Sequence, residues 1–272
     1  MARLIARSRH LGCALLCCWW TCALAAPDPY PDAARSYLLT KDDQLLWQHD
    51  ASARLPVASL VKLLTALVLL NDKWSNDQWL VVSSTAARTA PTRIGLRAGE
   101  QVRAGATLAA MLIRSANDAC MVLVESAAPT RQQFVTRMNQ YAATLKLQNS
   151  HFVDPCGFDA PDQYSTATDL LKIAQAAQQH PLIATLVAGN RADLTTKAGR
   201  HISFASTNQL LDRLPGAIGM KTGYTQQAGQ CLIALVRRDK HEVLLVMLGG
   251  KQRWWQAHKM IEDAFASTSS TP

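Results

Sequence analysis

The stretch Leu55-Pro56-Val57-Ala58-Ser59-Leu60-Val61-Lys62 opens an apolar segment that continues to Leu70. Apolar residues lie nearly all round this segment, a pattern typical of a helix buried inside a globular core. From Val57 the predicted helix has 14 residues, too few for a bilayer span of about 20. Ser59 stands in its first turn and shares a face with Lys62, three residues later. The sequence therefore predicts a hydroxyl beside an amine in an apolar environment.

Apolar runs near both ends of the chain predict strands, whereas the middle predicts helices. An early hairpin is expected from Tyr37-Leu38-Leu39 and Leu45-Leu46-Trp47, with a turn at Lys41-Asp42-Asp43-Gln44. Adjacent antiparallel strands are expected at residues 218–222, 231–236 and 243–248. Helices are expected at residues 168–179, at 251–265 and along the stripe Phe134, Met138, Tyr141 and Leu145. The predicted class is α/β (α+β), with an antiparallel sheet built from both chain ends, flanked by helices, and a helical lobe inserted.

Two further motifs follow the first in a fixed order, Ser115-Ala116-Asn117 and Lys221-Thr222-Gly223. A serine hydroxyl attacks a carbonyl well only if a base takes its proton, and Lys62 is placed to do so as a neutral amine. Its pKa would have to fall from about 10.4 to about 7.5, at a cost of roughly 4 kcal/mol. We expect burial and a second cation, Lys221, to lower it. The three motifs together predict an acyl-serine enzyme.

The remaining motif residues have expected roles in the same reaction. Ser115 would shuttle a proton between the base and the leaving amine, and Asn117 would hold Lys62 and the substrate backbone. Lys221 and Thr222 would bind a substrate carboxylate. Gly223 would let the acyl chain lie against the strand, because a Cβ atom there would block it.

These motifs and their context resemble the serine D-alanyl-D-alanine carboxypeptidases, which are low-molecular-mass penicillin-binding proteins. The resemblance extends from about Ala34 to about Ala264. Besides the three motifs, it rests on Leu55-Pro56-Val57-Ala58, Asn117-Asp118-Ala119-Cys120, Gly157-Phe158-Asp159, Tyr164-Ser165-Thr166-Ala167-Thr168-Asp169 and Gly219-Met220. It departs from the family pattern at Val61, where relatives usually carry Thr, and at Cys156, where a polar residue or His is common.

The resemblance implies a β-lactamase/transpeptidase-like fold with the site between two lobes, and cleavage of D-Ala-D-Ala in peptidoglycan stem peptides. β-Lactams would act as covalent inhibitors. The backbone N–H groups of Ser59 and Tyr224 would hold the oxyanion, and Arg253 matches a basic residue that helps to bind the substrate carboxylate. Many relatives continue into a β-rich domain and an amphipathic anchor, for which this chain has no room. It resembles the shorter branch, which includes DD-endopeptidases that cut cross-links, so carboxypeptidase and endopeptidase activity both stay open.

The first 26 residues are predicted to be a cleaved signal peptide. Arg3, Arg7 and Arg9 precede an apolar stretch over residues 11–26, and Ala23-Leu24-Ala25 offers the small residues of a cleavage site. An uncleaved membrane anchor is the less favoured alternative. The prediction places a catalytic domain over residues 27–266 in the periplasm, without a stable membrane anchor, and a disordered tail over residues 267–272.

Composition excludes several other classes. Loss of the three leader arginines would lower the net charge from +8 to +5, and no basic run suggests nucleic acid. The 7 histidines show no metal-ligand spacing, so we expect no metal and no cofactor. Four of the 7 cysteines lie in the predicted leader. Cys120, Cys156 and Cys231 remain, so at most one internal disulfide is possible, and the pairing stays open.

Two rival functions share these motifs. A class A β-lactamase needs an additional Glu to activate the deacylating water, but no Glu occurs between Glu125 and Glu242. Glu125 itself is only eight positions past Asn117, on the wrong stretch. A non-catalytic wall-binding or penicillin-sensing domain would not need to keep the full motif set. Both rivals are less favoured.

Overall fold

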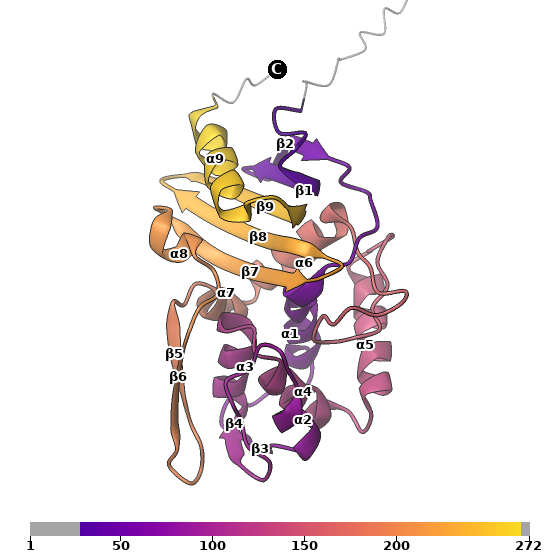
Figure 1. Ribbon diagram of the computed structural model, residues 1–272, viewed down its shortest axis with the longest axis vertical. Coiled ribbons are helices and arrows are strands. Elements are labelled where there is room, and N and C mark those ends of the chain that lie inside the picture. Colours follow the sequence, from indigo (N-terminus) through magenta and orange to yellow (C-terminus); the bar gives the residue numbers. More distant parts are fainter. Residues whose placement is uncertain (1–27, 268–272) are drawn as a thin grey trace, which may run out of the picture.

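The computed structural model describes residues 28–267, and its centre is a five-stranded antiparallel sheet in the order β2-β1-β9-β8-β7 (Figure 1). Its strands are β1 (Ala34–Lys41), β2 (Gln44–His49), β7 (Ala217–Thr225), β8 (Gly229–Arg238) and β9 (His241–Gly250). The first two strands in the chain pair with the last three, so the sheet joins both ends. This arrangement confirms the predicted fold class.

The early hairpin forms as predicted because its turn suits the twist of the strands. Asp42 and Asp43, which connect β1 to β2, have φ angles of 51° and 62°. A two-residue hairpin with positive φ at both central positions matches the right-handed twist of its strands, and Asp tolerates that conformation well.

Both faces of the sheet are buried, which explains why its central strands are continuous apolar runs in the sequence. On β8, Leu232 and Ala234 pack toward α9 (Arg253–Ala266), whereas Cys231 and Ile233 belong to the core shared with the other helices. Figure 1 shows α9 covering one face of the sheet while the remaining large helices lie beyond the other. The sheet is therefore the wall between two apolar layers.

The helical part lies between β2 and β7 in the chain, and most of it lies below the sheet in Figure 1. It comprises α1 (Lys62–Leu70), α2 (Ser84–Arg88), α3 (Ala104–Ile113), α4 (Asn117–Ala127), α5 (Arg131–Thr144), α6 (Ala167–Gln179), α7 (Pro181–Val187) and α8 (Leu210–Arg213). Helix α1 is buried along almost its whole length, as expected. No helix within residues 28–267 is both long and apolar enough to span a membrane.

One predicted boundary was wrong at the start of the buried helix. A 3₁₀ turn, η1 (Ala58–Val61), precedes α1, so Ser59 lies in a 3₁₀ turn and the α-helix begins at Lys62. Short 3₁₀ segments are frequent at helix ends and tighten the backbone there. The predicted strands and the helices after residue 168 occur within a few residues of their expected bounds.

Two small two-stranded sheets were not predicted. They are β3 (Trp79–Val81) with β4 (Gln101–Arg103), and β5 (Arg191–Thr195) with β6 (His201–Ala205). The β5–β6 hairpin projects away from the sheet beside α3 in Figure 1. These strands are short: β3 has three apolar residues, and β4, β5 and β6 mix apolar with polar residues, so they lack the long apolar runs that mark β8 and β9. The predicted signal peptide lies outside the described residues, as does the predicted tail apart from Ser267, whose carbonyl accepts a hydrogen bond from Lys41.

Candidate active site

The first motif places its two functional side chains in contact. Lys62 Nζ lies 2.8 Å from Ser59 Oγ, across the junction between η1 and α1. Ser59 is partly exposed, whereas the Lys62 side chain is completely buried among the apolar residues of α1 and its neighbours. The hydroxyl is therefore open to a ligand while the amine behind it is shielded from water.

Among the described residues, Lys62 Nζ has only neutral oxygens as hydrogen-bond partners. Its Nζ contacts Asn117 Oδ1 at 2.7 Å and also the backbone carbonyl oxygen of Cys156. No carboxylate within residues 28–267 forms an ion pair with this amine. Without a counter-ion, burial disfavours the charged form and lowers the pKa of Lys62 to about 7. A large fraction of the amine is then neutral near neutral pH, as a general base requires.

The second motif reaches the same place from the junction of α3 and α4. Ser115 lies between these helices with a φ of 62°, and Asn117 is the first residue of α4. Both are buried, at 5% exposure. The left-handed conformation of Ser115 is costly for a residue with a side chain and persists only where its surroundings enforce it. Ser115 and Asn117 thus face the first motif from the helical part of the molecule.

The third motif comes from β7, the edge strand of the sheet nearest η1. Lys221 Nζ lies 2.8 Å from Ser115 Oγ and 2.9 Å from the carbonyl oxygen of Thr222. The hydroxyl of Thr222 lies 2.6 Å from that of Thr207, a partner that no sequence motif indicated. The three motifs therefore meet, with Ser115 contacting the lysine of the third and Asn117 contacting the lysine of the first.

The two lysines do not influence each other as the sequence suggested. Burial accounts for the lowered pKa of Lys62, and Lys221 adds no resolved effect. Instead, burial and then the nearby charges of Lys62 and Arg253 hold the pKa of Lys221 well below its usual range. The effect of a second cation, which we expected to lower the pKa of Lys62, therefore lowers the pKa of Lys221 instead.

Gly223 marks the closest approach of β7 to the nucleophile. A Cβ atom at Gly223 would lie 3.0 Å from the Cβ of Ala58 and 3.1 Å from the backbone nitrogen of Ser59. Any larger residue would push η1 and β7 apart. Tyr224 follows on the same strand, and its side chain is 68% exposed. The backbone of Gly223 consequently lies close to that of Ser59.

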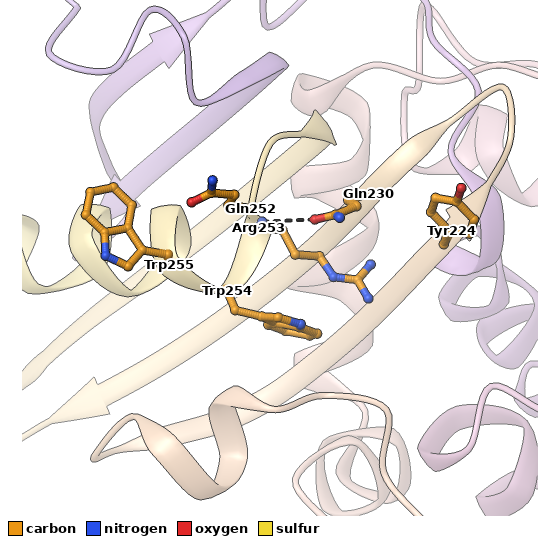
Figure 2. Close-up of a pocket in the computed structure, with 6 residues that line it drawn as sticks. All are labelled: Tyr224, Gln230, Gln252, Arg253, Trp254 and Trp255. Atoms are coloured by element: carbon orange, nitrogen blue, oxygen red, sulfur yellow. Dashed lines mark hydrogen bonds between the residues drawn. The ribbon is translucent and has the colours of Figure 1, made fainter.

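Arg253, at the start of α9, points toward β7 and β8. Its Nη1 donates to the carbonyl oxygens of Gly223 at 2.7 Å and Cys231 at 3.1 Å, and its backbone N–H donates to Gln230. Figure 2 shows its guanidinium above Trp254 within a surface pocket that Tyr224 also lines. The rest of the lining is Gln230, Gln252 and Trp255. Arg253 is thus at the rim of the site, bound to the strand.

A loop over residues 154–158 completes the site, and the motif analysis missed its structural role. The Asp154 carboxylate accepts the backbone N–H groups of residues 156, 157 and 158 and pairs with Arg131. Gly157 has a φ of 89°, and a Cβ there would lie 2.2 Å from the carbonyl oxygen of Ala58. The loop therefore packs directly against the turn that carries Ser59. The signal that could have indicated it was Cys156, an unusual residue just before a glycine.

The cysteine pairing is settled for the predicted mature chain. Cys120 on α4 and Cys156 on the loop form a disulfide, and Cys231 is free and buried in β8. No group of His, Cys, Asp or Glu within residues 28–267 is arranged to hold a metal ion. The site consists of hydroxyls, amides, backbone groups and two lysines.

Comparison with known proteins agrees with this geometry. A family model described as D-alanyl-D-alanine carboxypeptidase matches residues 25–252. DacB2 of Mycobacterium tuberculosis, a D-alanyl-D-alanine carboxypeptidase, is 32% identical over 88% of this chain and 84% of its own. The D-alanyl-D-alanine endopeptidase of Pseudomonas aeruginosa is 30% identical over 79% of this chain and 71% of its own.

Length varies among the relatives. The chain spans 64% of the length of the carboxypeptidase DacF of Bacillus subtilis, with 28% identity over 89% of this chain. The crystal structure of a Streptomyces DD-transpeptidase superposes with a TM-score of 0.83 at 27% identity, covering 89% of this chain and all (100%) of the other. Sequence, fold and the meeting of the three motifs agree: the chain belongs to the D-alanyl-D-alanine carboxypeptidase family of serine DD-peptidases.

Proposed function

We propose that this protein is a penicillin-sensitive serine DD-carboxypeptidase that removes the terminal D-Ala from peptidoglycan stem peptides. The observation that carries the proposal is the contact of Ser59 with a buried Lys62 whose partners are all neutral. This arrangement provides a nucleophile with a base that is available near neutral pH. Export by the predicted signal peptide, and hence a periplasmic location, belongs to the same proposal.

Acylation would use the groups as they stand. The Ser59 hydroxyl transfers its proton to Lys62 Nζ while Oγ attacks the carbonyl of the penultimate D-Ala, and the resulting oxyanion accepts the N–H groups of Ser59 and Tyr224. The C–N bond would then break, and the proton that Lys62 took from Ser59 would pass to the leaving amine by way of the Ser115 hydroxyl. Two donors already fixed in the backbone need no reorganisation, and losing one such donor typically costs 100-fold or more in rate.

Lys221 and Thr222 provide the recognition of the leaving group. The terminal carboxylate of the substrate would lie near Lys221 Nζ and the Thr222 hydroxyl, with Arg253 adding positive charge at the rim of the site. An anion there favours the protonated form of Lys221 and reverses the effect of burial on its pKa. The substrate would therefore complete a charge pair that the free site lacks.

Hydrolysis of the acyl-enzyme distinguishes this proposal from a β-lactamase. Asp154 is the carboxylate on the loop beside Lys62, but three backbone N–H groups and Arg131 already occupy it. Glu125 is exposed at the far end of α4. Neither is placed to activate water against a bound penicilloyl group, so we expect β-lactams to acylate Ser59 and leave slowly.

A DD-endopeptidase is the second candidate, because the relative from Pseudomonas aeruginosa has that activity in its name. A cross-link between D-Ala and a diamino acid also carries a carboxylate beside the scissile bond, so the same site residues serve both reactions. The two substrates differ in the size of the leaving group. The test is to incubate the protein with a pentapeptide monomer and with a cross-linked dimer and to identify the products by mass.

Release of D-Ala from the monomer, faster than cleavage of the dimer, supports the carboxypeptidase. Preferential conversion of dimer to monomers would replace it with the endopeptidase. Labelling by a fluorescent penicillin should disappear in Ser59→Ala and survive in Ser126→Ala, which changes an exposed serine on α4. Equal labelling of both variants would refute the assignment of Ser59.

A further inference from the structure

The disulfide joins the two elements that hold the base. Asn117 and Cys120 are three residues apart on α4, so they lie on one side of the helix. The side-chain oxygen of Asn117 and the backbone carbonyl oxygen of Cys156 both accept hydrogen bonds from Lys62 Nζ. The Cys120–Cys156 bridge thus connects the helix that carries one acceptor to the residue that carries the other.

These two acceptors fix the direction in which the amine can act. A neutral lysine amine has two N–H bonds and one lone pair, arranged tetrahedrally around nitrogen with the Cε bond. When Asn117 Oδ1 and the Cys156 carbonyl accept the two N–H groups, the lone pair faces the third neighbour, Ser59 Oγ, at 2.8 Å. The spacing of the two acceptors therefore decides whether the base faces the nucleophile.

Other contacts hold the loop over residues 154–158 in place, but they do not set the distance between the two acceptors of Lys62. Asp154 organises the backbone of the loop, and Thr65 on α1 donates to the carbonyl oxygen of Pro155 at 2.6 Å. These contacts tie the loop to itself, to α5 through Arg131 and to α1, whereas the bridge ties it to α4. Both cysteines are at most 1% exposed, so the bridge excludes water behind Lys62.

Burial is the resolved cause of the lowered pKa of Lys62, although several charged groups lie on the elements around it. Lys221 on β7 shares the site, and the charge of Lys62 lowers the pKa of Lys221. Three carboxylates on neighbouring elements accept backbone N–H groups. Asp118 on α4 accepts that of residue 95, Asp154 accepts that of residue 156, and Asp169 on α6 accepts that of residue 149. A change in the packing behind Lys62 should therefore change the pKa of its amine.

We infer that the Cys120–Cys156 disulfide is a positioning element of the catalytic site, which shields the Lys62 amine from water and directs it at Ser59. The inference rests on the proposed function, in which Lys62 is the base. Cys120 and Cys156 touch no substrate and act only through Lys62. The bridge accordingly contributes to the rate of acylation as well as to stability.

The test compares the wild-type protein with Cys120→Ala/Cys156→Ala, which keeps the backbone carbonyl of residue 156 but removes the bridge. A second variant, Cys120→Val/Cys156→Ala, fills more of the vacated space and guards against loss of folding. Ile261→Ala is the matched control, because Ile261 is fully buried between α9 and the sheet, away from Lys62. Each protein is acylated with a fluorescent penicillin from pH 5.5 to 9.5, and Tm is measured alongside.

In the wild type, acylation should rise with pH through a midpoint of about 7, the pKa of Lys62. Without the bridge we expect acylation at pH 7 to fall about tenfold, since a misdirected base loses its pre-organisation. The midpoint should also move upward, because water behind Lys62 favours the charged amine. Ile261→Ala should lower Tm and leave the midpoint in place.

The outcomes distinguish a bridge that positions Lys62 from a bridge that only stabilises the fold. If both bridge-free variants lose Tm but keep the wild-type rate and midpoint, the bridge serves stability alone and the inference is wrong. If the wild type itself shows no penicillin adduct at Ser59, the proposed function fails and the inference fails with it.

Discussion

Replacement of Lys62 by Arg keeps the positive charge but removes the capacity to accept a proton. An amine with a pKa of about 7 is roughly 90% neutral at pH 8. A guanidinium holds its proton so much more tightly that it is neutral in only about one molecule in 30,000 at that pH. If Lys62 must be neutral to act, Lys62→Arg should therefore acylate at least about 10⁴-fold more slowly than the wild type.

The assay is the rate of Ser59 acylation by a fluorescent penicillin, followed over time and across pH. Wild-type rates should increase as pH rises through about 7, because deprotonation of Lys62 creates the active base. In Lys62→Arg the much lower rate should show neither a midpoint near 7 nor a plateau by pH 9, because the guanidinium stays protonated throughout this range. The larger guanidinium would also press on the Asn117 and Cys156 acceptors, so circular dichroism and Tm should be recorded for the same samples.

Lys172→Arg serves as the control, since Lys172 is a partly exposed residue on α6 that donates to a backbone carbonyl. It should acylate at the wild-type rate. A folded Lys62→Arg protein that acylates within tenfold of the wild type would show that Lys62 is not the base. A wild-type profile that is flat between pH 6 and 8 would contradict the low pKa of the amine.

Two further substitutions and one time course on the wild type test the site. Asn117→Asp places a carboxylate against Lys62, so the pKa of the amine should rise and the acidic limb of the acylation profile should move upward by about two pH units. Gly223→Ala forces a methyl group to 3.0 Å from the Ala58 side chain, and steady-state kinetics with D-Ala-D-Ala peptide should show at least a tenfold loss of kcat/KM. The penicilloyl adduct on Ser59 should persist for hours by intact mass while the same preparation still releases D-Ala, and rapid loss of the adduct with sustained drug hydrolysis would instead indicate a β-lactamase.

Much of the fold was predictable because its strongest patterns are local. The central strands are buried on both faces, so they appear as uninterrupted apolar runs such as residues 231–236. The strands of the β5–β6 hairpin alternate apolar with polar residues and expose one face, so they showed no uninterrupted apolar run. The 3₁₀ turn before α1 was also missed, since an apolar segment predicts burial but does not distinguish a 3₁₀ turn from the α-helix that follows it.

The candidate site, like the fold, has some features that the sequence could reveal and others that it could not. Residues whose side chains carry the chemistry could be found by type and spacing: Ser59 and Asn117 meet at the Lys62 amine, and Ser115 contacts Lys221. Partners that act through the backbone could not be found. The Cys156 carbonyl would have the same hydrogen-bonding capacity on any residue, and the pairing of Cys120 with Cys156 depends on how α4 meets a loop 36 positions away in sequence.

The two buried lysines explain why the site needs its neutral partners. A carboxylate beside Lys62 would keep the amine charged and remove the base, whereas a carboxylate beside Lys221 would occupy the position proposed for the substrate. Hydroxyls, an amide and carbonyls satisfy both amines without fixing either charge. Burial then lowers both pKa values in the free protein. When a substrate carboxylate arrives, it would restore the proton of Lys221 alone, so that Lys221 binds as a cation while Lys62 remains neutral and available to Ser59.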